Sequence, residues 1–401
     1  MDSTDIKPLV TVYHRKLATT SLAFKRYLYN IINWNVRLVG IKGARGVGKT
    51  TMLLQRIKET FNNVDDAFYV SLDNLWFDHY SLIDLVEYLY TRGITHLFFD
   101  EVHKYPSWIV TLKNLYDNYP DLQIVYTGSS MLDIDNSKSD LSRRQSLYTL
   151  NGLSFREYLA YEDVLSVEPI EFTELLSRHV DYAMNVTGKI KVLKHFDTYL
   201  QTGYYPFYKE VDTDYYMRLN EVARLVIEND LPSVEDVTFA TIQKTKKLLM
   251  ILAQSVPLVP NISQLCGQLE ATRDLCFKML YALDKAGILY LLTDKIKSYK
   301  QLAKPAKIYL ANTNLMYALS TNVPKGSVRE TFFANQVSVD YSLTMPRAGD
   351  FRVNDNYLFE VGGNSKTFDQ IADAPNSYLA VADVETGYGN RIPLWLFGML
   401  Y

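Results

Sequence analysis

Short apolar runs alternate with helical patterns in the first part of the chain, from Arg37 to about Leu150. This alternation is typical of a parallel sheet wrapped by helices. The sequence therefore predicts the α/β fold class, with helices on both faces of a parallel sheet. The candidate strands are residues 37–41, 67–72, 96–100, 122–127 and 147–150.

The pattern becomes helical and locally acidic after this predicted sheet. Ser154 and Glu157 have the spacing of a capping box, so a helix should begin at Phe155. Further along we predict helices at 244–254, 263–269 and 272–286, a turn at 270–271, and two extended runs separated by residues 294–300. The last segment mixes a helix near 329–341 with strands near Arg352 and at 357–361.

These changes of pattern divide the chain into four predicted segments. Its 401 residues are enough for two to three domains with cores of their own. The predicted segments are the sheet domain at 1–160, a helical region at 161–240, a second helical domain with extended runs at 241–306, and a small α/β domain at 307–401.

The charge balance and the cysteine content indicate which partners and which cellular compartment to expect. The 42 Lys and Arg residues against 45 Asp and Glu give a net charge of -3, so no global excess attracts nucleic acid. The only cysteines, Cys266 and Cys276, exclude a disulfide framework and favour a reducing compartment. No signal peptide and no run of about 18 apolar residues is present. We therefore expect a cytoplasmic protein without membrane association.

The strongest chemical signal follows the first candidate strand, where residues 43–50 read G-A-R-G-V-G-K-T and fit the phosphate-binding pattern G-x-x-x-x-G-K-[ST]. The glycines let backbone N–H groups face phosphate oxygens, and the following helix adds the positive end of its dipole. Lys49 would neutralise the β- and γ-phosphates, and the Thr50 hydroxyl would hold Mg²⁺. A glycine-rich turn without a ligand is the alternative. The predicted nucleotide-binding residues are Gly43, Ala44, Arg45, Gly46, Val47, Gly48, Lys49, Thr50 and Thr51.

A second signal is the apolar strand T-H-L-F-F-D-E, which ends in two carboxylates. Asp100 would bind the hydrated Mg²⁺, and Glu101 would orient and deprotonate the attacking water. A buried strand with a polar end explains the same residues without chemistry. Together with the phosphate-binding loop, the pair predicts hydrolysis rather than binding alone.

Hydroxyls and arginines follow the fourth candidate strand. Thr127 and Ser129 come where the γ-phosphate would lie, so either could sense it or position the water. A simple strand-to-loop turn is the alternative for the same residues. Arg143 and Arg144 come after the polar stretch 133–140, from which a loop could present a guanidinium to the transition state. Ordinary surface charge is the alternative for these arginines.

Together these segments resemble a known family. Residues 43–50, 100–108, 126–130 and 153–159 are similar to the prokaryotic AAA-superfamily ATPases that pair an N-terminal nucleotide-binding core with an uncharacterised C-terminal domain. The similarity continues through 199–206 and 307–310. It implies Mg-ATP as ligand, with Lys49 and Thr50 binding nucleotide and metal and Asp100 and Glu101 serving Mg²⁺ and water. Arg144 matches the family's arginine, while Arg143 replaces a usual glycine and leaves open which arginine acts.

Residues 261–294 have the pattern of a winged helix, whose second helix would lie in a DNA major groove. Residues 241–307 carry ten Lys and one Arg against four acidic residues, with much of the charge at Lys295, Lys297, Lys300, Lys304 and Lys307. Phosphate contact is therefore plausible. Winged helices also bind proteins, so both double-stranded DNA and a protein partner, including a second copy, stay open.

The C-terminal segment resembles the restriction-endonuclease-like fold found in this family, with Asp350 and Glu360 where metal-binding carboxylates would stand. The lysine expected two residues after Glu360 is Gly362, and the helix position that usually carries an acid is Ala334. Lys366 is the remaining cation that could reach the site. We therefore predict a degenerate domain without nuclease activity.

These observations lead to three functional hypotheses. The first is an ATP-hydrolysing switch based on Lys49, Thr50, Asp100 and Glu101. The second is a DNA-associated protein whose winged helix brings the C-terminal domain to DNA. The third is a nucleotide-binding scaffold for protein partners with slow turnover.

Overall fold

The computed structural model describes residues 2–61, 66–129, 141–211, 213–234, 237–294, 304–372 and 374–401. The chain divides into two compact units. The first comprises Met1–Asn151 and Asp230–Asp236, and the second comprises Gly152–Asn229 and Val237–Tyr401. Among the described residues, no helix combines the length and the apolar character needed to span a membrane.

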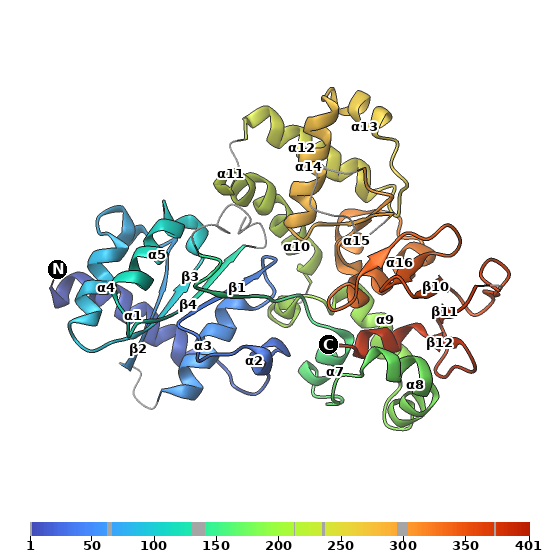
Figure 1. The fold of residues 1–401 in the computed structure, drawn as a ribbon, viewed down its shortest axis with the longest axis horizontal. Helices are drawn as coiled ribbons and strands as arrows, with labels where there is room; N and C mark the ends of the chain where they lie inside the picture. The colour runs from blue at the N-terminus through green and yellow to red at the C-terminus, as the bar shows by residue number, and fades with distance from the viewer. Residues whose placement is uncertain are drawn as a thin grey trace. The chain divides into compact units, whose positions relative to one another are not determined.

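A five-stranded sheet forms the centre of the first unit (Figure 1). Its strand order is β2-β3-β4-β1-β5, and all neighbours are parallel. The strands are β1 Leu38–Gly43, β2 Ala67–Ser71, β3 His96–Asp100, β4 Gln123–Ser129 and β5 Ser146–Thr149. The predicted parallel sheet is confirmed, and each predicted strand is present to within two residues at either end.

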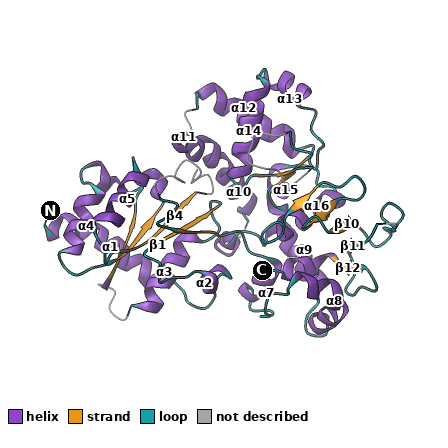
Figure 2. Ribbon diagram, viewed as in Figure 1, coloured by secondary structure: helices purple, strands orange, loops and turns teal. Residues whose placement is uncertain are grey.

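Helices lie on both sides of this sheet, as Figure 2 shows. Helix α3 packs against β1 and β4, α1 packs against α3 and β2, and α4 packs against α5. The helices are α1 Ser3–Thr19, α2 Leu28–Ile31, α3 Lys49–Thr60, α4 Leu82–Tyr90, α5 Trp108–Asn118 and α11 Leu231–Val234, with 3-10 turns η2 Leu75–Asp78 and η3 Val102–Lys104.

The sheet is held together by apolar side chains that pack without gaps. Leu38, Val39 and Ile41 of β1 are completely buried, as expected for a central strand covered on both faces. Gly40 has no space for a side chain, because an added Cβ would lie 2.7 Å from the ring of Tyr126. Close packing of this kind fixes the position of β1 and therefore of the loop that follows it.

Strand register brings the polar strand ends to one edge of the sheet. Ile41 of β1 lies opposite Thr127 of β4, and Phe99 of β3 lies opposite Tyr126. The phosphate-binding loop, Asp100 and Thr127 therefore emerge side by side. This is the carboxyl edge of the sheet, where ligands bind in open α/β folds.

The second unit begins with helices. Ser154 caps α7 through the predicted capping box with Glu157. Aromatic rings of Phe155, Tyr199 and Phe332 pack against one another in its core. The helices of this part are α7 Phe155–Tyr161, α8 Phe172–Thr187, α9 Val192–Thr202 and α10 Tyr215–Leu225, with the 3-10 turn η4 Pro206–Glu210 and the π-helical turn η5 Val226–Asp230, which ends in the first unit.

Three helices and an antiparallel strand pair follow. Thr272 caps the third of these helices by accepting a hydrogen bond from the Leu275 N–H, and Glu270 turns the chain in left-handed conformation (φ 49°). The elements are α12 Phe239–Ala253, α13 Ile262–Leu269, α14 Arg273–Lys285, β6 Leu289–Leu292 and β7 Lys307–Leu310. Lys295, Lys297 and Lys300 lie outside the described residues.

A mixed five-stranded sheet completes the second unit. Its order is β12-β11-β10-β9-β8, with β10, β11 and β12 parallel and β8 and β9 antiparallel to their neighbours. The predicted helix near 329–341 begins one turn earlier. The elements are α15 Thr313–Leu319, α16 Lys325–Val337, β8 Leu343–Thr344, β9 Phe351–Val353, β10 Tyr357–Gly362, β11 Ser377–Val381, β12 Arg391–Pro393 and the 3-10 segment η6 Leu394–Met399.

Candidate nucleotide-binding site

The loop between β1 and α3 has the backbone that a phosphate-binding loop requires. Gly46 and Gly48 have φ angles of 87° and 98°, which favour glycine strongly. Gly43 lies so close to the next strand that an added Cβ would be 2.3 Å from the Leu150 carbonyl oxygen. Helix α3 begins at Lys49 without a side-chain cap. Its first N–H groups are therefore available to an anion.

Lys49 points into the loop. Its Nζ donates hydrogen bonds to the carbonyl oxygens of Gly43 at 2.9 Å and Ala44 at 3.1 Å. Burial lowers the pKa of Lys49, while the nearby carboxylates of Glu101 and Asp100 act in the opposite direction. A cation held in this way, facing two acids, suits the neutralisation of phosphate charge.

Asp100 lies at the centre of a set of hydroxyl groups. Its Oδ2 accepts hydrogen bonds from Thr50 Oγ1 at 2.7 Å and from the Tyr69 hydroxyl at 2.8 Å, while Oδ1 accepts from Thr127. The carboxylate is 2% exposed. The hydroxyl of Thr50 and the carboxylate of Asp100 are oxygen ligands of the kind that Mg²⁺ prefers. These two residues, both predicted as metal ligands, are therefore brought together and fit the ion.

Glu101 follows directly but faces differently. Its backbone is left-handed, with φ 54° and ψ 43°, which is uncommon for a non-glycine residue. The N–H of Glu101 donates to Thr127 Oγ1 at 3.2 Å, and its Oε2 lies 3.4 Å from His103 Nε2. The Glu101 carboxylate therefore lies beside the His103 ring. A carboxylate so placed can accept a proton while Asp100 holds a metal.

Several residues of this site were not predicted. Tyr69 of β2 reads as a core residue, yet its hydroxyl links Lys16 of α1, at 3.0 Å, to Asp100. His103 and Lys104 follow the acid pair by only two and three residues, and proximity along the chain was a usable signal for them. Asp230 also lies here, beside Lys104, and no local pattern points to it.

Arg144 is not part of this cluster. Its guanidinium forms a two-pronged ion pair with Asp117 of α5, with Nε–Oδ1 at 2.8 Å and Nη2–Oδ2 at 3.0 Å. Arg143 is exposed. Ser129 is 7% exposed and its N–H donates to His103 Nδ1. Ser130 and the polar stretch 133–140 lie outside the described residues.

The two acids predicted for the C-terminal domain also lie near each other. Asp350 accepts a hydrogen bond from the Val361 N–H at 2.8 Å, and Lys366 Nζ lies 2.5 Å from Glu360 Oε1. Gly362 leaves room for this lysine, because an added Cβ would be 2.8 Å from Lys366 Cγ. The lysine therefore reaches the acid from the following loop.

An acid absent from the prediction lies beside this pair. Glu330 of α16 is four residues before Ala334, hence on the same helix face, and it pairs with Lys307 at 2.5 Å. Burial, followed by Glu330, raises the pKa of Asp350 to about 6. Among the described side chains, no group of three or more His, Cys, Asp or Glu is arranged to hold a metal ion.

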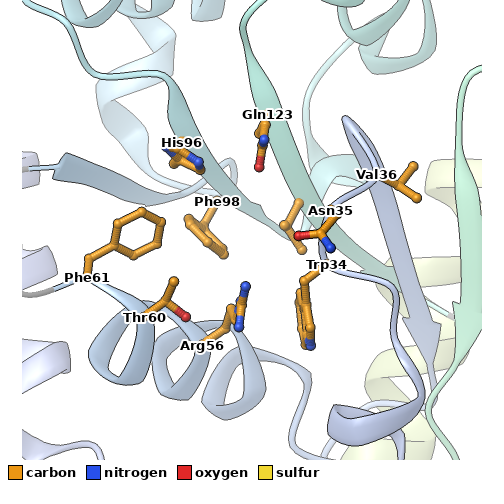
Figure 3. Close-up of a pocket in the computed structure, with 10 residues that line it drawn as sticks. Trp34, Asn35, Val36, Arg56, Thr60, Phe61, His96, Phe98 and Gln123 are labelled. Atoms are coloured by element: carbon orange, nitrogen blue, oxygen red, sulfur yellow. The ribbon is translucent and has the colours of Figure 1, made fainter.

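A separate pocket lies at the opposite edge of the first sheet. Its volume is about 220 Å³, and its lining includes His96 and Gln123, the first residues of β3 and β4. Figure 3 shows Arg56 beside Trp34, whose ring centre is 5.1 Å away. Because the phosphate-binding loop follows the other ends of the strands, this pocket is distinct from the nucleotide site.

Comparisons with known proteins agree with this geometry. Residues 35–159 match a family model described as a AAA domain. An uncharacterized protein of Methanocaldococcus jannaschii is 28% identical over 392 residues, covering 86% of this chain and 82% of that protein.

Solved structures share less with the chain. A katanin structure has a TM-score of 0.32 at 13% identity and covers 48% of this chain and 80% of its own. DnaA from Aquifex aeolicus has a TM-score of 0.24 at 12% identity, covering 71% and 89%. Hsp104 of S. cerevisiae has a TM-score of 0.27 at 14% identity, covering 68% and 40%. These likenesses are too loose to support an argument.

The family assignment depends instead on the matched segment and its geometry. The match spans β1 to α7, including the phosphate-binding loop, Asp100 and Glu101. This part of the chain is therefore a AAA domain that contains the phosphate-binding loop.

Proposed function

We propose that the protein hydrolyses Mg-ATP and works as a nucleotide-driven switch. The observation that carries this proposal is the cluster in which Thr50 and Thr127 donate to the Asp100 carboxylate while Glu101 stands beside it. ATP rather than GTP is inferred from the family resemblance. Bound Mg²⁺ would supply charge stabilisation to the phosphates.

The chain's own groups have separate tasks in this proposal. Lys49 and the N–H groups at the start of α3 bind the phosphates, and Thr50 and Asp100 hold the metal. Glu101 takes a proton from water, and Thr127 fixes the Glu101 backbone through its hydroxyl. Arg144 pairs with Asp117, so a catalytic role for it requires this exposed ion pair to open.

For the second unit we propose a winged helix that contacts duplex DNA. Support comes from α13, the turn at Glu270, α14 and the β6-β7 pair, which follow in the order of a winged helix. Arg273, Lys278 and Lys285 of α14 are exposed. Phosphate contacts made by this exposed face of α14 would make binding sensitive to salt.

A scaffold for protein partners, a second copy of the chain among them, is the second candidate. The observation that favours it is that part of the local positive charge is already neutralised. Lys246 pairs with Glu228, and Lys307 pairs with Glu330. These two lysines contribute less to a DNA-binding surface than the sequence count suggests.

Steady-state ATP hydrolysis tests the proposal, measured for the wild type and for Glu101→Gln with and without duplex DNA at low and moderate salt. We expect turnover by the wild type and a loss of roughly 10²-fold or more in Glu101→Gln, because the base is removed. Glu87→Gln, an exposed carboxylate of α4 in the same domain, is the matched control and should keep wild-type turnover.

The DNA arm separates the two candidates. Stimulation by duplex DNA that weakens with salt supports the DNA-contacting winged helix. Hydrolysis that depends on Glu101 but ignores DNA supports the protein scaffold. Equal turnover by the wild type and Glu101→Gln contradicts the proposed role of this residue.

A further inference from the structure

One buried carboxylate of the first unit comes from a distant part of the sequence. Asp230 is 2% exposed, and its Oδ1 lies 3.1 Å from Lys104 Nζ and 3.4 Å from Arg45 Nη1. His103 Nε2 is 3.9 Å from the same oxygen. Arg45 belongs to the phosphate-binding loop, and His103 and Lys104 follow the catalytic acid pair. The carboxylate therefore lies at the nucleotide site.

The surroundings of Asp230 are those of an anion site. Burial acts to raise the pKa of Asp230, but His103 and Lys104 outweigh it and hold the pKa below its ordinary value. The field of Asp230 also reaches Lys49 in the loop. A buried carboxylate keeps its charge only when cations surround it in this way.

His103 Nε2 lies near two carboxylates, 3.4 Å from Glu101 Oε2 and 3.9 Å from Asp230 Oδ1. Its Nδ1 accepts a hydrogen bond from the Ser129 N–H at 3.4 Å, which places the ring proton on Nε2. Nε2 is buried and makes no hydrogen bond of good geometry to the described residues, although Glu101 and Asp230 both lie near it. The donor is therefore oriented toward an anion but not satisfied by one.

We propose that Arg45, His103 and Lys104 form a binding site for the terminal phosphate of a nucleoside triphosphate, and that Asp230 competes with this phosphate for them. The inference rests on the proposed function and extends it to the discrimination of triphosphate from diphosphate. Both competitors are anions with oxygen acceptors, and a phosphate carries more charge and more acceptors than a carboxylate.

The position of Asp230 in the chain gives this competition a consequence. Asp230 ends η5, which continues α10 of the second unit, and it precedes α11. Displacement of its carboxylate would release the chain where it passes between the units. A ligand shifts an equilibrium between two states only when it binds them with different affinities. Here the terminal phosphate would bind the state in which the Asp230 carboxylate is displaced more tightly than the state in which Asp230 occupies the cations.

Binding of fluorescent ATP and ADP analogues to the full chain, in the presence of Mg²⁺, tests the proposal without measuring turnover. We expect Asp230→Asn to bind the ATP analogue about 5-fold more tightly or better, the lower end of usual coupling effects. The ADP analogue should change less than about 2-fold, because it lacks the competing phosphate.

Two control variants test whether the negative charge at position 230 is responsible for the effect. Glu228→Gln removes an acid two residues earlier, which pairs with Arg224 and Lys246 instead, and should leave both affinities unchanged. Asp230→Glu keeps the charge and should not gain ATP affinity. If Asp230→Asn shows no cooperative thermal unfolding, Lys104→Gln replaces it and should lose about 5-fold in ATP affinity with little change for ADP.

Two results would overturn the inference. One is an unchanged ATP affinity in Asp230→Asn, and the other is an equal change for ATP and ADP. In both cases binding by the wild type leaves the proposed function standing. If the wild type binds neither analogue, the proposed function fails together with the inference.

Discussion

Asp100 in the first unit and Glu360 in the second are both buried acids on β-strands, and they have different partners. Asp100 ends β3 of the parallel sheet, and its partners are the neutral hydroxyls of Thr50, Tyr69 and Thr127. Glu360 lies in β10 of the mixed sheet, and it pairs with the ammonium group of Lys366, beside the side-chain amide of Gln370. Hydroxyl donors orient a carboxylate but leave its charge available to a cation, whereas an ammonium group neutralises it.

The difference shows that a strand carrying an acid does not by itself indicate a metal site. The identity of the donors around the carboxylate decides whether a divalent ion has a charge to bind. At the nucleotide site the lysine, Lys49, is held by the backbone carbonyls of Gly43 and Ala44 and stays off the acids. In the C-terminal sheet, by contrast, Lys366 forms an ion pair with the Glu360 carboxylate.

The largest expected effect concerns the hydroxyl-bonded acid. Asp100→Asn should lower Mg²⁺-dependent ATP turnover roughly 10²–10³-fold, because the metal loses its charged ligand. Asp350→Asn, the matched change in the C-terminal sheet, should leave turnover unchanged. Hydrolysis measured across a Mg²⁺ series, with chelator as the zero point, compares the two variants. A similar loss in Asp350→Asn would contradict the comparison.

An intermediate effect concerns the lysine-bonded acid. Lys366→Met should reduce the free energy of unfolding by about 2 kcal/mol, because Glu360 remains 2% exposed without its cation. The figure is below that of a fully buried pair, since the lysine side chain is 34% exposed. Urea unfolding measures it, and adding Glu360→Gln to the same variant should restore most of the loss. No loss in Lys366→Met would show that the pair is not stabilising.

The smallest effect is a pH dependence of Asp350, whose pKa of about 6 is above its ordinary value of 3.8 because of burial and then Glu330. Between these values the folded state binds more protons than the unfolded state, so stability falls as pH rises through this window. Asp350→Asn should remove that loss and be more stable than the wild type above pH 6. The free energy of unfolding of the wild type and of Asp350→Asn, measured at pH 4 and at pH 7, checks the sign. A larger gain for Asp350→Asn at pH 4 than at pH 7 would contradict the prediction.

Much of the first unit follows from local sequence signals. Strand β3 was predicted over the residues that form it, His96 to Asp100, because a short apolar run between turns has few other conformations in a soluble protein. The phosphate-binding loop has fixed spacing, so its glycines and Lys49 were found together. Thr127 was predicted because it ends the fourth candidate strand.

The remaining site residues depend on tertiary packing. Lys366, which the sequence analysis named as the cation that could reach this site, does contact Glu360, but its spacing of six residues belongs to no regular element and did not fix the contact. Tyr69 reads as apolar within β2, and only the neighbouring strand shows that its hydroxyl meets Asp100. Asp230 follows Lys104 by 126 residues, and no pattern at this separation connects them. Glu330 could have been predicted, because it lies one helical turn before Ala334, the helix position that was considered for an acid.

The return of Asp230–Asp236 makes the first unit discontinuous in sequence. A fragment that ends at Asn151 would contain every predicted nucleotide-binding residue but would lack Asp230, the counter-charge of Arg45 and Lys104. Such a fragment would carry excess positive charge around its phosphate-binding loop. A single cut therefore does not isolate the nucleotide-binding unit. An isolated unit would need both stretches of the chain, Met1–Asn151 and Asp230–Asp236.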